Sequence, residues 1–400
     1  MTKRRSFVAG LALSIAAAGA AASPGLAPKP VAVVPFDLVN RHVFVKVTVG
    51  SRELSFVLDS GAPVAIIDTA RTKDLGLALG REFAAHGAGG NAAAAAVEGA
   101  TYRVPGVPGF AGDVAIAMPL QPMAPGLGRD FDGVLGASFI REFVVELDWQ
   151  ARVLRLHDSA SFDYRGTGAI VPIRLNHSGH PVFRGSVTPA GGAPIPGDFV
   201  FDIGSNAAVE LRRPFVEEHH LPGPAVATIR SFAAGAGGRL KGVMGRVSSF
   251  TIGGFTIEKP VAVFSQDTSG VNAMADVAGS IGQRIAGKFT IFFDYARERL
   301  ILEPNAEFRE GVDRAFSGLS LQAFGPDYRT FRVVDVIPGG AADRAGVREG
   351  DVIAAIDGRK AADWTLTAIL DLLERAAPHR LALRRADRDL EVVLTPGGLV

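Results

Sequence analysis

Two aspartates, Asp59 and Asp202, have closely similar neighbours although they lie far apart in the sequence. Each ends an apolar run and is followed two positions later by glycine, in FVLDSGAPVAIID (56–68) and FVFDIGSNAAVEL (199–211). Taken singly, Asp-x-Gly is common turn chemistry. Taken together, two carboxyl groups could divide the work of hydrolysis, because an ionised one can take a proton from water while a protonated one gives a proton to a carbonyl oxygen. That chemistry requires a fold that brings the two segments together.

The similarity extends well beyond the two aspartates. Upstream, VVPFDL (33–38) matches IVPIRL (170–175), and downstream GVLGASFIREFVVELDWQARVLRL (133–156) matches GSIGQRIAGKFTIFFDYARERLIL (279–302). The matches occur in the same order at slowly drifting offsets, so we infer a tandem duplication of one unit. Each unit consists of β-branched and aromatic runs separated by turn residues, which predicts strands.

These paired motifs resemble the pepsin and retropepsin family of aspartic proteases, over residues 31–304. The resemblance implies two β-lobes, here residues 23–165 and 166–305, each of which contributes one aspartate from an Asp-Thr/Ser-Gly loop. It assigns the catalytic dyad to Asp59 and Asp202, support of the active-site loops to Ser60, Gly61, Gly204 and Ser205, and the psi-shaped strand crossings to Gly136 and Gly282. Since both aspartates belong to one chain, no dimer is required to complete the dyad.

Two features depart from the family pattern. The residue after the aspartate normally carries a hydroxyl group that hydrogen-bonds to the opposite loop; Ser60 keeps this group and Ile203 does not. We therefore expect half of this brace to be missing and the dyad to be looser or differently packed. The first-lobe flap, which the resemblance places at residues 88–98, consists of small residues, with Tyr102 just beyond it. Such a flap predicts a mobile tip and an undemanding cleft.

After residue 304 the repeat ends and another pattern begins. The segment PGGAADRAGVREGDVIAAIDG (338–358) and the helical pattern TLTAILDLLERA (365–376) resemble a PDZ domain, which we place at residues 315–397. The resemblance implies that a loop receives a peptide carboxyl terminus while the peptide adds a strand beside a helix. That loop would be Gly318, Leu319, Ser320 and Leu321, with serine where glycine is usual. The alternative is a β-rich domain that only packs on the protease lobes.

The amino terminus predicts export. Basic residues 3–5 precede an apolar run of small residues that ends in a small-x-small pattern, which is typical of a cleaved signal peptide over residues 1–22. The two arginines fit a twin-arginine signal as well as a general secretory one. A membrane anchor is the alternative, but the run is short for a span. The mature chain is then expected in the periplasm or outside the cell, without a stable membrane span.

Composition and motif searches exclude other classes of function. A net charge of +1 without a basic patch argues against nucleic-acid binding, and the lack of cysteine excludes disulfides and thiol nucleophiles. The run Glu217-Glu218-His219-His220 fits no zinc-protease motif and is expected at a helix end, so neither metal nor cofactor is predicted.

The sequence thus predicts a mainly β protein with a bilobal pepsin/retropepsin-like fold, followed by a small α+β PDZ domain. The predicted activity is that of an exported aspartic endopeptidase acting on polypeptides, with a carboxyl-terminal peptide as a further partner of the PDZ domain. The alternative from another class is an inactive bilobal binding protein that works through its PDZ domain.

Overall fold

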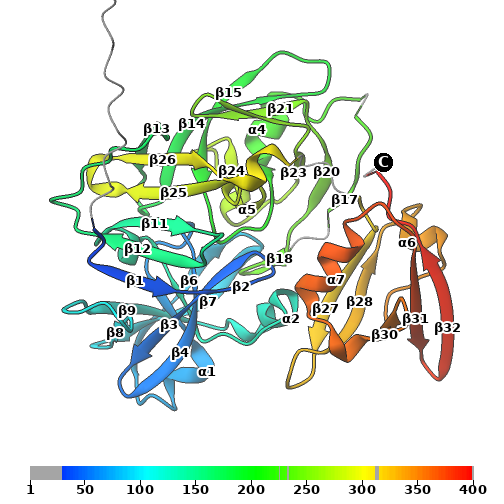
Figure 1. Ribbon diagram of the computed structural model, residues 1–400, viewed down its shortest axis with the longest axis horizontal. Coiled ribbons are helices and arrows are strands. Elements are labelled where there is room, and N and C mark those ends of the chain that lie inside the picture. Colours follow the sequence, from blue (N-terminus) through cyan, green and yellow to red (C-terminus); the bar gives the residue numbers. More distant parts are fainter. Residues whose placement is uncertain (1–28, 225, 232–233, 311–314, 399–400) are drawn as a thin grey trace, which may run out of the picture.

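A computed structural model describes residues 29–224, 226–231, 234–310 and 315–398, so the predicted signal peptide lies outside the described residues. The fold is mainly β and has two barrel-like lobes with a smaller domain beside them (Figure 1). The predicted fold class, two β-lobes followed by an α+β PDZ domain, is confirmed.

The first lobe is built around one twisted sheet, in which the strand order is β2-β3-β4-β10-β5-β9-β7-β6, with β8 beside β3 and β9. Its strands are β1 (Ala32–Pro35), β2 (Asp37–Val39), β3 (His42–Val49), β4 (Arg52–Leu58), β5 (Ala65–Asp68), β6 (Ala78–Gly87), β7 (Gly90–Glu98), β8 (Thr101–Arg103), β9 (Gly112–Met118), β10 (Gly133–Leu135), β11 (Val144–Asp148) and β12 (Val153–His157). Its helices are single turns: α1 (Thr69–Thr72), η1 (Gln121–Met123), α2 (Ala124–Leu127) and α3 (Ala137–Ile140).

The second lobe repeats this plan. Its strands are β13 (Ala169–Leu175), β14 (Pro181–Thr188), β15 (Ile195–Phe201), β16 (Val209–Leu211), β17 (Ile229–Arg230), β18 (Ala234–Gly235), β19 (Gly238–Arg239), β20 (Gly242–Arg246), β21 (Ser249–Ile252), β22 (Phe255–Glu258), β23 (Val261–Ser265), β24 (Gly279–Ile281), β25 (Phe289–Asp294) and β26 (Arg299–Pro304). Its helices are α4 (Arg213–Glu218), η2 (Val271–Ala273), α5 (Gln283–Ala286), η3 (Tyr295–Arg297) and η4 (Ala306–Arg309). Since α4 ends at Glu218, the Glu217–His220 run lies at a helix end, as expected.

A shared sheet joins the two lobes. Its order is β1-β12-β11-β25-β26-β13, with β11 and β25 antiparallel at the centre, where Val145 faces Phe293. Three strands from one repeat therefore face the three corresponding strands of the other. Most buried apolar residues of both lobes form one continuous core, which includes Phe56, Phe139, Phe199 and Phe293. Burial of this core stabilises the lobes as a pair.

The third domain is a small sheet with two principal helical segments. It comprises β27 (Leu319–Phe324), β28 (Thr330–Val336), α6 (Ala341–Arg344), β29 (Val352–Ile356), β30 (Arg359–Lys360), η5 (Ala361–Asp363), α7 (Leu366–Leu373), β31 (His379–Arg385) and β32 (Arg388–Leu394). Along β27, buried Leu319, Leu321 and Ala323 alternate with less buried residues, as expected for a strand with one face on a core.

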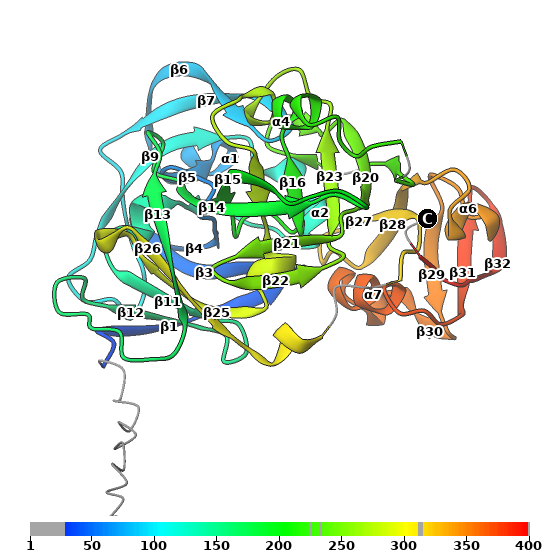
Figure 2. The ribbon, with the colours of Figure 1, turned by 90° about the horizontal axis from the view of Figure 1, so that it is seen from above.

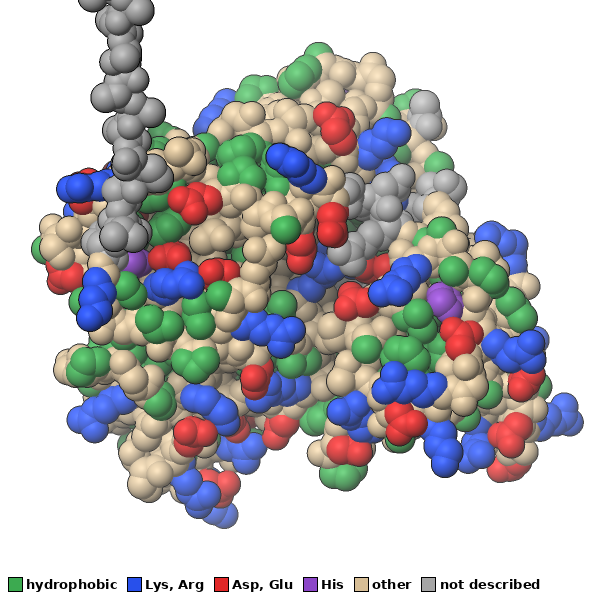
Figure 3. Space-filling model, viewed as in Figure 1, with side chains coloured by type: hydrophobic (Ala, Val, Ile, Leu, Met, Phe, Trp, Pro, Cys, Tyr) green, Lys and Arg blue, Asp and Glu red, His purple; other side chains and the backbone are tan. Residues whose placement is uncertain are grey.

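Seen from two directions, this domain lies against the two β-lobes, with β27 and α7 toward α2 (Figures 1 and 2). Basic and acidic side chains are interspersed over the face drawn in Figure 3, in keeping with the near-neutral net charge. Among the residues that the structure describes, no helix has both the length and the apolar character needed to cross a bilayer.

Candidate active site

Each predicted aspartate follows a strand in a three-stranded crossing. In the first lobe, β10 lies between β4, to which it is parallel, and β5, to which it is antiparallel. In the second lobe, β24 has the same relation to β15 and β16. The amide of Asp59 donates to the carbonyl oxygen of Leu135 at 2.9 Å, and the amide of Asp202 donates to that of Ile281 at 2.9 Å. The two loops are therefore held in equivalent ways.

The crossings explain why Gly136 and Gly282 are glycines. A Cβ atom at Gly136 would lie 2.5 Å from the carbonyl oxygen of Val64, and one at Gly282 would lie 2.5 Å from that of Ser205. Real Cβ contacts are not that short, so any side chain here would force two backbone segments apart. Both residues sit where the sequence analysis placed the psi-shaped crossing.

The two aspartates are brought together across the lobe interface. A Cβ atom at Gly61 would lie 2.6 Å from Oδ1 of Asp202, and one at Gly204 would lie 2.2 Å from Oδ1 of Asp59. Each carboxyl group thus occupies the space beside the glycine of the opposite loop. Only a residue without a side chain permits this approach.

Backbone donors fix the two carboxyl groups. The amide of Gly61 donates to Oδ1 of Asp59 at 2.7 Å, and the amide of Gly204 donates to Oδ1 of Asp202 at 2.8 Å. Burial of Asp59 raises its pKa well above the usual value, and the neighbouring Asp202 raises it further through its charge and a hydrogen bond between the groups. Two like charges this close cannot both ionise readily, so the pair can retain a proton.

The brace between the loops is asymmetric, as the sequence suggests. The Ser60 hydroxyl donates to the carbonyl oxygen of Phe201 at 2.7 Å and accepts from the amide of Ile203 at 3.0 Å. The Ile203 side chain is fully buried and has no polar atom that could hydrogen-bond to the first loop. Instead, Gln283 donates from Nε2 to the carbonyl oxygen of Ile203, which holds the second loop from within its own lobe.

His42 is a cross-lobe contact that the sequence analysis did not identify. This buried residue begins β3 of the first lobe, and its Nε2 lies 3.1 Å from the carbonyl oxygen of Gly204 in the second. Its Nδ1 lies 2.7 Å from the carbonyl oxygen of Asn40. Burial lowers the pKa of the imidazole and favours its neutral form. The available signal was a titratable residue opening the otherwise apolar run HVFV.

Ser205 supports the second loop locally. Its Oγ accepts from the amide of Ala207 at 3.2 Å, and its carbonyl oxygen accepts from the amide of Gln283 at 2.8 Å. Unlike Ser60, it has no described side-chain hydrogen bond to the opposite lobe. Ser205 therefore shapes the turn after the aspartate rather than joining the lobes.

The predicted flap segment is the turn and second strand of the β6–β7 hairpin. The amide of Gly89 at its tip donates to the carbonyl oxygen of Ala236 at 2.8 Å, in the β18–β19 hairpin of the second lobe. Cβ atoms at Gly87 and Gly89 would lie within 2.3 Å of backbone oxygens in that hairpin. Close approach of two backbones is thus a reason for the small residues that the sequence did not reveal.

A polar cluster lies near Asp202 in the second lobe. Glu210, in β16, accepts a hydrogen bond from Nδ2 of Asn272 at 2.7 Å. Burial of the Glu210 carboxyl raises its pKa to about 7, and the charges of Asp202 and Asp267 act in the same direction. Glu210 was also missed, because the sequence shows it only as one polar residue within a strand.

The predicted peptide-binding loop lies at the start of β27. Gly318 has φ of +76°, and its carbonyl oxygen accepts from the amide of Ile337 at 2.8 Å. Leu319 and Leu321 are buried, whereas Ser320 is half-buried and faces Asp335 in the ladder with β28. The predicted loop thus leads into β27, which lies beside α7, and its Leu319 and Leu321 belong to a core separate from that of the lobes.

Comparisons with known proteins agree with this architecture. A model of the aspartyl protease family matches residues 45–139, and a model of the PDZ domain matches residues 332–385. No match was found among curated proteins. The photosystem II D1 C-terminal processing protease is 29% identical over 22% of this chain and 25% of its own, with a TM-score of 0.20, too low to support any argument. The chain therefore carries an aspartyl protease domain, of the pepsin/retropepsin-like fold, together with a carboxy-terminal PDZ domain.

Proposed function

We propose that this protein is an exported aspartic endopeptidase in which Asp59 and Asp202 share one proton and hold the attacking water between them. One observation carries the proposal: each carboxyl group lies against the glycine of the opposite loop, within a duplicated strand crossing. The matching aspartyl protease family model supports the same class of reaction.

The two carboxyl groups would exchange roles during the reaction. The raised pKa of Asp59 favours it as the resting holder of the proton. Ionised Asp202 takes a proton from water as the hydroxyl attacks the amide carbon, and Asp59 gives its proton to the carbonyl oxygen. When the C–N bond breaks, Asp202 returns its proton to the amide nitrogen and Asp59 recovers one from the intermediate's hydroxyl group. The starting protonation state is then restored.

Binding of substrate or partner termini by the PDZ domain belongs to the same proposal, as does export to the periplasm or beyond the cell. A tethered terminus would raise the effective concentration of substrate near the cleft without adding chemistry. The PDZ family match supports the binding of peptide termini. The signal-like amino terminus supports export.

The decisive experiment is cleavage of casein by residues 23–400, from acid to neutral pH. Asp59→Asn and Asp202→Asn should each abolish cleavage while leaving the circular dichroism spectrum unchanged. Asp163→Asn is the matched control, because Asp163 is exposed and pairs only with Arg165 among the contacts described. Cleavage that survives in either dyad variant would disprove the mechanism, and a folded wild type without cleavage would favour the scaffold alternative.

A further inference from the structure

The PDZ domain has one sheet edge suited to receive a peptide strand. β27 pairs only with β28, so its other edge is unpaired, and α7 lies beside that edge. Among the described backbone hydrogen bonds, none joins Leu319–Phe324 to any strand but β28. PDZ domains bind peptides by adding a strand at such an edge, with main-chain hydrogen bonds giving affinity. The accessibility of this edge therefore decides whether the domain can bind a peptide.

The first protease lobe occupies the space beside that edge. Helix α2 contacts β27 (Figures 1 and 2). Gly128, which follows α2, packs so closely on Leu366 that a Cβ atom there would lie 2.8 Å from the Cβ of Leu366, the first residue of α7. Next to this contact, the amide of Asn40 donates to Oγ1 of Thr367 at 2.7 Å. The first lobe thus reaches both β27 and α7, the two elements that flank an added peptide.

The PDZ domain is tied to the second lobe as well. The guanidinium group of Arg230 forms two hydrogen bonds with the Asp335 carboxylate in β28, at 2.6 and 2.8 Å, and Arg239 forms another. The Asp335 side chain is 6% exposed, whereas those of Arg230 and Arg239 are 52% and 63% exposed, so these ion pairs are shielded from solvent only on the carboxylate side. Bidentate arginine–carboxylate pairs are among the stronger polar contacts in proteins.

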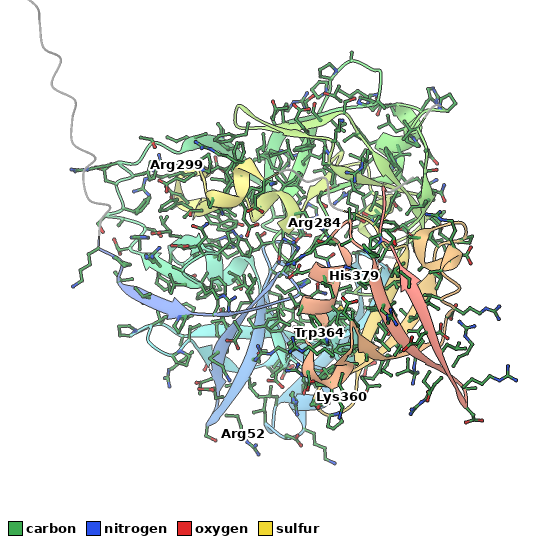
Figure 4. All side chains as sticks on the ribbon, turned by 45° about the vertical axis from the view of Figure 1, so that its right-hand side comes forward. Arg52, Arg284, Arg299, Lys360, Trp364 and His379 are labelled. Carbon is green, nitrogen blue, oxygen red and sulfur yellow. The ribbon has the colours of Figure 1, made fainter. Side chains whose placement is uncertain are left out.

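The arginines connect Asp335 to the tip of the first-lobe flap. Arg239 ends β19, and the turn between β18 and β19 supplies the carbonyl oxygen of Ala236 that accepts from Gly89. A second tie lies just after α7, where Glu374 forms ion pairs with Arg284 of the second lobe and Arg41 of the first. Figure 4 labels Arg284. The docked PDZ domain therefore restrains the hairpin that touches the flap.

We propose that residues 124–128 of the first lobe are the resident occupant of the PDZ peptide edge, and that an apolar carboxyl-terminal peptide must displace them to bind. Undocking of the PDZ domain then releases Asp335 from Arg230 and Arg239 and frees the β18–β19 hairpin beside the flap. The buried leucines at this edge, Leu319, Leu321 and Leu366, set the apolar preference. The second step rests on the proposed proteolytic function, whereas the first does not.

The two binding events compete, so their free energies are coupled. Only undocked molecules bind the peptide, and the apparent dissociation constant rises by the inverse of their fraction. While the docked state predominates, a change that weakens docking tightens apparent peptide binding by the same factor, and by reciprocity bound peptide weakens docking. A peptide that binds should likewise increase the undocked population.

Gly128→Val tests the first step, because the new side chain would be forced against Leu366 and should undock the domain. Gly106→Val is its matched control: Gly106 has φ of +83°, close to the +74° of Gly128, but its Cβ position is in open space. Both substitutions therefore impose similar backbone strain, and only one affects the docking contact. Circular dichroism and thermal unfolding should show both variants folded.

The probe is a fluorescein-labelled octapeptide pool with random sequence and a terminal valine or leucine, as the free carboxylate and as the amide. In residues 23–400, Gly128→Val should bind the free-carboxylate pool about tenfold more tightly than the wild type or Gly106→Val, which corresponds to about 1.4 kcal/mol of lost docking. The amidated pool should bind none of them well. Equal binding by wild type and Gly128→Val, or no binding by either, would overturn the inference.

Asp335→Asn tests the second step through casein cleavage, which should accelerate several-fold as the hairpin is released. Asp198→Asn is the matched control, since Asp198 is also held by two arginines, Arg174 and Arg184, but within one lobe. Equal rates in the two variants would show that the PDZ domain does not restrain the cleft. If no variant cleaves casein, the proposed function fails, and the peptide measurement still decides the first step.

Discussion

The Ser60 hydroxyl joins the two active-site loops as both donor and acceptor of a hydrogen bond. Ile203, at the matching position of the second loop, has no polar side-chain atom that could do the same. Gln283 donates to the carbonyl oxygen of Ile203, and Nε2 of His42 lies 3.1 Å from that of Gly204, so the contacts to that loop are mainly with its backbone. A buried apolar side chain at position 203 is tolerated because these other donors fix the loop. The dyad is therefore symmetric in its strands and asymmetric in its side-chain support.

We expect Ser60→Ala to destabilise the protein. The change removes both hydrogen bonds across the interface and leaves the buried amide of Ile203 without its acceptor, a loss that costs about 1–3 kcal/mol. Urea unfolding measures the difference directly. Ser161→Ala is the control, because Ser161 is exposed and bonds only to nearby Asp158. An unchanged unfolding free energy in Ser60→Ala would contradict the role of this hydroxyl in joining the lobes.

The raised pKa of Asp59 predicts an effect of pH on stability. Between its unfolded and folded pKa values the folded state binds more protons than the unfolded state, so stability falls as pH rises through that window. Asn cannot ionise, so Asp59→Asn should escape this loss, worth about 1.4 kcal/mol for each pH unit of difference. The variant should melt higher than the wild type near pH 7 and no higher near pH 3. If the difference in melting temperature between variant and wild type is the same at pH 3 and pH 7, the Asp59 pKa is not raised by folding.

At the scale of elements, the strand crossing under each aspartate leaves no room for side chains. β10 and β24 each run between two other strands, and the glycines that follow them, Gly136 and Gly282, face backbone oxygens. Each aspartate is thereby held at the lobe interface by two strands that are close in the sequence and a third that is distant from both. Short helices α3 and α5 then follow the glycines at equivalent positions.

Gly136→Ala should therefore be strongly destabilising. Its Cβ would lie 2.5 Å from the carbonyl oxygen of Val64 and 2.6 Å from that of Ala62, and overpacking of this kind costs about 1–3 kcal/mol or more. Gly192→Ala provides the comparison, because its nearest contacts, with Pro189, begin at an ordinary 3.4 Å. Thermal unfolding should show a lower melting temperature for the first variant alone. Equal melting temperatures would mean that the crossing relaxes easily.

At the scale of the whole molecule, duplication places both halves of the dyad in one chain. The shared sheet holds the two lobes together by backbone hydrogen bonds, and the continuous core does so by packing. The PDZ domain adds a second core and docks on both lobes through Asn40, Asp335 and Glu374. This arrangement supports a complete cleft within a monomer.

Casein cleavage per mole of chain should consequently remain constant over a wide dilution series. A dyad assembled from two chains would lose specific activity on dilution, because dissociation removes one aspartate from each site. Sedimentation at the same concentrations reports the oligomeric state. Specific activity that falls in parallel with dissociation would contradict a single-chain site.

The sequence by itself determined the duplicated β-fold, the PDZ domain and the pairing of Asp59 with Asp202. The duplication follows from the same order of motifs occurring twice, whereas the bilobal fold, the PDZ domain and the pairing of the two aspartates are what the resemblance to known families implied. Gly136 and Gly282 were identified by their place in the repeated motif and its resemblance to the family, and the structure supplies the steric reason for glycine there. The Ile203 departure was visible too, since the matching position is a hydroxyl residue in the first repeat.

Only the tertiary structure decided what closes the site and what covers the PDZ edge. His42 reaches Gly204, the flap meets the β18–β19 hairpin, and α2 lies against β27, all between segments distant in the chain. Such contacts depend on the shapes of the folded lobes and domains, and the local spacing of residues in the sequence does not predict them. Short motifs therefore predicted the candidate catalytic residues, whereas the contacts around the candidate active site and the PDZ edge depend on packing between lobes and domains.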